Sequence, residues 1–166
     1  VIGHENLQAI IMAGGKAPAT AGNYNAIGKL TTSGDASLAY IAAGQTKDDS
    51  SFANRIGMAE NPDAGIGAVS VGGNWFHSNL TAGINDVNSA GVSSGDTRDT
   101  GDATRHAVLG PVVIKGLVTD NPMLSGLSGF AAEKIASITA GGVKVFKTGD
   151  ADKKLEAFSF VNVREI

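Results

Sequence analysis

Four aspartates lie in one glycine-rich stretch and could ligate a cation. Asp86, Asp96, Asp99 and Asp102 fall within INDVNSAGVSSGDTRDTGDAT, residues 84–104. Hard cations such as calcium prefer carboxylate and carbonyl oxygens of this kind. The spacing matches neither an EF-hand loop nor the calcium-binding nonapeptide repeat. Ordinary turn chemistry is the alternative, because Asp and Asn side chains hydrogen-bond their own backbone in turns.

The same stretch could supply catalytic groups. A polysaccharide lyase or glycosidase needs paired carboxylates, or a metal with an Arg or Lys base, and Asp96, Asp99 and Arg98 offer such groups. Arg98 and Arg105 could equally neutralise the carboxylates without any ion. Only analogy between folds would support an enzyme, so we expect a protein that is not an enzyme. A carbohydrate-binding or polysaccharide-cleaving module stays open as the alternative.

The other residues with chemical potential are scattered. His4, His77 and His106 include no pair at i, i+4, so a zinc site would require them to converge with carboxylates in space. Cysteine is absent, which excludes disulfides and thiolate metal sites. Trp75 and Phe76 are adjacent, so in a strand one is expected inside and the other outside, where it could stack on a sugar or a neighbouring subunit.

The composition favours a repetitive β architecture. The 166 residues include 23 glycines and only 5% aromatics, and the apolar content is mostly small aliphatic. Such residues suit a narrow core crossed by many tight turns. The net charge of −3 and the scattered Lys and Arg give no support for nucleic-acid binding. No apolar run approaches the roughly 18 residues that span a bilayer.

Five octads organise the chain. Each begins with Ile or Leu, has an aliphatic residue three positions later, and ends with Gly; they are residues 7–14, 27–34, 66–73, 109–116 and 135–142. Residues 27–44 also align without a gap to residues 66–83. Short strands of this kind must stack to bury an apolar face, with Gly at each corner. The pattern predicts an all-β, right-handed parallel β-helix (β-solenoid), its handedness following the general preference for right-handed crossovers.

Three segments interrupt the repeat and are predicted to be inserted loops: residues 17–24, 45–62 and 84–104. The last is expected to bulge out of the stack. Residues 129–134 are the best helix candidate, although the run is short. Residues 157–166 are predicted to be a strand with an alternating apolar face.

Three segments resemble a known family. SVGGNWFHSNLTAGIND (70–86), FAAEKIASITAGGVKVF (130–146) and VNVREI (161–166) are similar to repeats near the C-termini of large bacterial hemagglutinin-like or adhesin-like surface proteins, which occur in planctomycetes and proteobacteria. The similarity spans residues 60–166, and the N-terminal third departs from it. The resemblance implies a parallel β-helix on an exported protein. It supplies no catalytic motif and no defined metal motif.

Together these features predict a structural or interaction module at the cell surface or outside the cell. We expect residues 1–166 to form a single domain, cut from the C-terminal part of a longer protein. Unpaired strand edges at its ends would associate with a second copy or with the parent chain, as a scaffold or fibre subunit with an adhesive role. Calcium is the one cofactor considered, and surface polysaccharide is a further possible partner.

Overall fold

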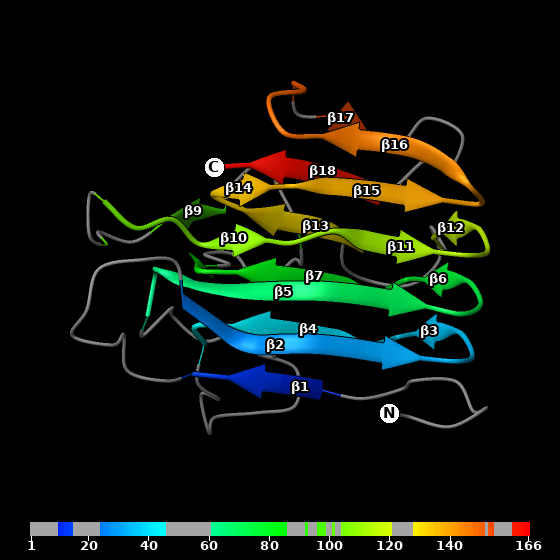
Figure 1. The fold of residues 1–166 in the computed structure, drawn as a ribbon, viewed down its shortest axis with the longest axis horizontal. Helices are drawn as coiled ribbons and strands as arrows, with labels where there is room; N and C mark the ends of the chain where they lie inside the picture. The colour runs from blue at the N-terminus through cyan, green and yellow to red at the C-terminus, as the bar shows by residue number, and fades with distance from the viewer. Residues whose placement is uncertain are drawn as a thin grey trace.

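The computed structural model describes residues 10–14, 24–45, 61–85, 92, 96–98, 101, 104–120, 128–151, 153–154 and 161–166. These residues form strands and turns and contain no helix (Figure 1), so the all-β prediction is confirmed. The helix considered for residues 129–134 is wrong, because this segment forms parts of two strands. Among the described residues, therefore, no helix exists that could cross a membrane.

A seven-stranded sheet holds four of the five octads. Its strands are β2 (Tyr24–Thr32), β5 (Ala64–Val71), β10 (Val108–Leu109), β11 (Val112–Ile114), β14 (Lys134–Ile135), β15 (Ser137–Ala140) and β16 (Val143–Lys147). Ile66 lies beside Ile27 on one side and Leu109 on the other. The octads therefore pair in the register that their sequences predict.

A six-stranded and a three-stranded sheet complete the main structure. The six-stranded sheet contains β1 (Ile10–Ala13), β4 (Tyr40–Ala43), β7 (Asn79–Ala82), β13 (Ser128–Ala132), β17 (Lys153–Lys154) and β18 (Val161–Glu165). The three-stranded sheet contains β3 (Ala36–Ser37), β6 (Trp75–Phe76) and β12 (Val118–Thr119). Strand β1 belongs to the first octad but pairs with β4, so this octad does not stack on the other four.

The prediction of a right-handed parallel β-helix is wrong. The sheets mix parallel and antiparallel strands, and no closed or coiled sheet is found among the described residues. The antiparallel pairs are β15 with β16, β17 with β18, and β8 (Ile84–Asn85) with β9 (Thr97–Arg98).

Gly141 and Gly142 explain part of this error. Both have positive φ, at 54° and 80°, which is the conformation that a two-residue hairpin turn requires. They connect β15 directly to β16 and return the chain antiparallel. In the sequence, Gly142 resembles the corner glycine of a fifth octad, because a single glycine looks the same in either role.

One hydrophobic core lies between the three sheets. Trp75 from β6 is fully buried, and its ring centroid lies 5.0 Å from that of Phe130 on β13. Its indole N–H donates to the carbonyl of Ser78 at 3.1 Å. Inward side chains of the seven-stranded and six-stranded sheets, among them Ile66, Leu80 and Val112, also belong to this core. Strands of two to four residues thereby bury a common apolar interior.

Val92 belongs to the segment predicted to bulge outward, most of which lies outside the described residues. Val92 is buried against Ala131 and Ile84 on the outer side of the six-stranded sheet. The Asn162 side-chain amide donates to the Val92 carbonyl at 2.9 Å. Asp96 is also buried. An apolar residue in the middle of this polar stretch thus belongs to a second small hydrophobic cluster.

Two glycines test how tightly adjacent segments approach. Gly83 has a φ of +63°, and an added Cβ would overlap the Pro62 carbonyl and the Ala107 side chain. We predict that Gly83→Ala lowers the free energy of unfolding by at least about 2 kcal/mol, from backbone strain plus overlap. Urea denaturation followed by circular dichroism measures this change.

Gly28→Ala is the matched control, because a Cβ at this position meets nothing within 4 Å. It should change stability by less than about 1 kcal/mol. Equal losses in the two variants would contradict the packing described around Gly83.

Candidate functional site

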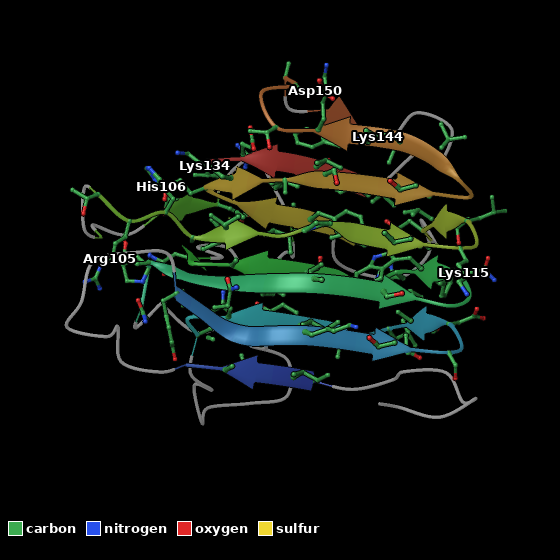
Figure 2. All side chains as sticks on the ribbon, viewed as in Figure 1. Arg105, His106, Lys115, Lys134, Lys144 and Asp150 are labelled. Carbon is green, nitrogen blue, oxygen red and sulfur yellow. The ribbon has the colours of Figure 1, made fainter. Side chains whose placement is uncertain are left out.

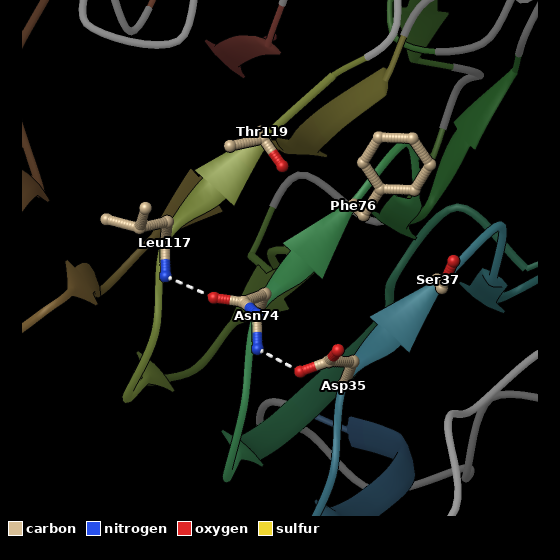
Figure 3. A pocket seen from close by; sticks show the side chains of 6 residues that line it. All are labelled: Asp35, Ser37, Asn74, Phe76, Leu117 and Thr119. Carbon is tan, nitrogen blue, oxygen red and sulfur yellow. Dashed lines mark hydrogen bonds between the residues drawn. The ribbon is translucent and has the colours of Figure 1, made fainter.

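The outer face of the three-stranded sheet carries a shallow groove. In each strand the first residue points into the core: Ala36, Trp75 and Val118 are fully buried. The second residue points outward, as alternation in a strand requires. The expectation that Trp75 and Phe76 face opposite sides is therefore confirmed. We call this concavity the β6 groove; it is lined by Asp35, Ser37, Asn74, Phe76, Leu117 and Thr119 (Figure 3).

Strand register places the lining residues in two rows. Ser37, Phe76 and Thr119 are direct neighbours across the three strands, with the phenyl ring in the middle. Asp35, Asn74 and Leu117 each lie two positions earlier in the chain and form the second row. Neighbouring strands are about 4.8 Å apart, so each row spans roughly 10 Å.

Hydrogen bonds between residues next to neighbouring strands hold the second row in place. The Asp35 carboxylate accepts from the Asn74 backbone N–H at 2.6 Å, and the Asn74 side-chain oxygen accepts from the Leu117 N–H at 2.9 Å (Figure 3). Each side chain thereby satisfies a backbone donor at the start of the next strand. This leaves Asp35 one further carboxylate oxygen and Asn74 its amide NH₂ group for other partners.

A column of glycines makes room for these bonds. The Gly73 N–H donates to the Gly34 carbonyl at 3.0 Å, and the Gly116 N–H donates to the Gly73 carbonyl at 2.9 Å. A Cβ at Gly73 would overlap the Asp35 carboxylate, and one at Gly116 would overlap the Asn74 side-chain oxygen. The octad glycine is therefore needed here for close approach, as the sequence predicts.

A histidine–carboxylate pair borders the groove. His77 follows Phe76 and contacts Asp120 through Nδ1. This contact links the residue after β6 to the residue after β12. Both groups are largely buried, with side chains 13% and 2% exposed. His77, the residue after β6, has a φ of +39°. Leu38, the residue after β3, has a φ of +54°. Two non-glycine residues thus adopt the left-handed conformation directly after neighbouring strands of the three-stranded sheet. The sequence did not predict this conformation.

The second histidine lies at another corner of the structure. His106 contacts Glu133 through Nδ1, and the other Glu133 oxygen accepts from the Ala107 N–H at 3.2 Å. Figure 2 shows His106 near Arg105 and Lys134. Each of these two histidines has its own carboxylate partner, and no metal-ligating group of three His, Asp or Glu side chains exists in the described part of the chain.

The predicted cation site lies mostly outside the described residues. Asp86, Asp99 and Asp102 are not described, and neither is His4. Asp96 precedes β9 and is 4% exposed. The structure therefore does not bring the four aspartates together or separate them, and calcium binding stays a prediction. The catalytic alternative built on Asp96, Arg98 and Asp99 is equally untested.

Of the groove residues, only Phe76 was predicted from the sequence as a possible contact residue. A signal for part of the groove was available, since the alignment of residues 27–44 with 66–83 already pairs Asp35 with Asn74 and Ser37 with Phe76. What it lacked was the third strand, which contributes Leu117 and Thr119. No protein-family model, no curated protein and no solved structure matches this chain.

We predict that Asp35→Ala destabilises the fold by about 1 kcal/mol, because the Asn74 N–H loses its acceptor. Asp35→Asn is the control, since its side-chain oxygen can accept the same bond. Chemical denaturation of both variants measures the difference, and a loss of the same size in Asp35→Asn would show that charge and not the hydrogen bond matters.

Proposed function

We propose that this chain is a structural and interaction module of an extracellular bacterial surface protein, and that it associates with a second copy through the sheet edges at its N-terminal end. The resemblance of residues 60–166 to adhesin-like repeats supports the cellular setting and an adhesive role. One structural contrast supports the mode of association: the two ends of the sheets differ in how their edges are protected.

The C-terminal end carries the features of a protected edge. Strand β16 runs antiparallel to β15 and contains the exposed residues Lys144 and Lys147. Figure 2 shows Lys144 at this end of the sheets. Lysines on short edge strands oppose pairing with another chain. Phe146 from β16 is 1% exposed and closes the core at this end.

The N-terminal end lacks these features in the described part of the chain. The outer edges of β1 and β2 have no strand partner there, and these strands carry a single charged residue, Lys29. Ile11, Ile27 and Leu30 face the core but are only partly buried. Ile66 and Val69, which pair with Ile27 and Leu30 on the neighbouring strand β5, are at most 1% exposed.

Incomplete burial gives a second copy something to gain. A partner strand on this end would pair with the backbone groups that have no strand partner among the described residues, and it would cover the exposed parts of these apolar side chains. Because only this end lacks a protected edge among the described residues, two copies would meet edge to edge around a two-fold axis. Such an interface uses the same surface of both copies and closes at two, so we expect a dimer and not a fibre.

We predict that Gly28→Lys weakens this dimer at least about tenfold, since it adds a charge to the open β2 edge. An added Cβ at Gly28 meets nothing in the monomer, so the variant should fold normally. Light scattering coupled to size-exclusion chromatography, over a range of protein concentrations, measures the dissociation constant.

Val143→Lys is the matched control, because Val143 is 63% exposed on the protected end. It should leave association unchanged. A wild-type chain that is monomeric at the highest concentration, or a Gly28→Lys variant that associates as the wild type does, would overturn the proposal.

A further inference from the structure

We propose that the β6 groove binds a neutral pyranose unit of a polysaccharide, with Phe76 as the stacking platform. This goes beyond the proposed association, which uses the backbone edges of β1 and β2. The groove instead uses outward side chains of β3, β6 and β12, with the aromatic ring on the central strand of the three. Binding and association are therefore separable by substitution.

The position of the Phe76 side chain is fixed from beneath and from one side. The preceding residue, Trp75, is fully buried, hydrogen-bonded and packed on Phe130, which holds the short β6 strand in place. The His77 ring centroid lies 6.4 Å from that of Phe76, and His77 is itself held by Asp120. An aromatic side chain that is already ordered loses little conformational entropy when a flat ligand stacks on it.

Polar groups surround the ring in the arrangement that a sugar requires. Ser37 and Thr119 lie on either side of Phe76 in the same row, and each hydroxyl can both donate and accept. Asp35 adds an acceptor and Asn74 adds donors from the second row. Sugar hydroxyls also donate and accept, while the C–H face of a pyranose is apolar. A mixed rim around one aromatic ring fits that chemistry.

Charge narrows the class of sugar. Among the described residues, the lining contains one carboxylate, Asp35, and no cationic side chain. Uronate or sulfated polysaccharides would place their negative charge near Asp35 with no compensating cation in the lining, which is unfavourable. An apolar peptide is also a poorer ligand, because four of the six lining residues are polar and would lose water without gaining matched partners. A neutral hexose or N-acetylhexosamine is the ligand that the lining favours.

The test is calorimetric titration of the full chain with three probes: cellohexaose, chitohexaose and tetragalacturonate. We expect one of the two neutral oligomers to bind and tetragalacturonate not to bind. Phe76→Ala should weaken binding at least tenfold, and Thr119→Val should weaken it several-fold by removing one hydroxyl. Val113→Ala is the control, because Val113 is exposed on the seven-stranded sheet outside the groove; this variant should bind as the wild type does.

Thermal unfolding of each variant separates a lost contact from a lost fold, and if Phe76→Ala does not fold then the Thr119→Val result decides. No binding of either neutral oligomer, preferential binding of tetragalacturonate, or unchanged affinity in the folded groove variants would each overturn the proposal. Light scattering of the same variants should show unchanged association, so failure here is distinguishable from failure of the dimer proposal.

Discussion

Burial of inward side chains from very short strands is the constraint on which the rest of this structure depends. Strands of two residues, such as β3 and β6, cannot be stable alone, because they bury almost no apolar surface. They persist because three sheets share one core, in which Trp75 packs against Phe130 from a different sheet. Parallel pairing in register then places each inward residue beside an inward residue of the neighbouring strand. The outward positions align for the same reason, and they create rows of side chains on the surface.

Glycine determines which of these rows can carry polar groups. The column formed by Gly34, Gly73 and Gly116 removes Cβ atoms where the chain turns toward the three-stranded sheet. The Asp35 and Asn74 side chains occupy the space that these Cβ atoms would fill. Asp35 accepts a hydrogen bond from the Asn74 N–H, and Asn74 accepts one from the Leu117 N–H. Asp35 and Asn74, which line the proposed sugar site, therefore also link neighbouring strands. Substitution of Asp35 or Asn74 would therefore also remove a hydrogen bond between neighbouring strands.

The two ends of the sheets solve the edge problem differently. At the C-terminal end, a hairpin turn brings β16 back along β15, inserts Phe146 into the core and exposes lysines. At the N-terminal end, the described strands are nearly uncharged and their inward side chains remain partly accessible. In the association proposed above, this asymmetry would favour contacts between the N-terminal ends of two copies. The outward groove of β3, β6 and β12 stays separate from those contacts, because side chains line it and not backbone edges.

The sequence by itself determined that the chain is all-β, that residues 27–44 lie beside residues 66–83, and that Trp75 and Phe76 face opposite ways. These features follow from local periodicity and from glycine spacing, which a single chain displays directly. It did not determine strand direction at the C-terminal edge, because Gly141–Gly142 can serve as a corner or as a hairpin turn. Nor did it reveal the packing of Val92 onto Ala131, or the contribution of Leu117 and Thr119 to the groove. Only the tertiary structure decided these points, because they depend on which distant segments compete for the same buried surface.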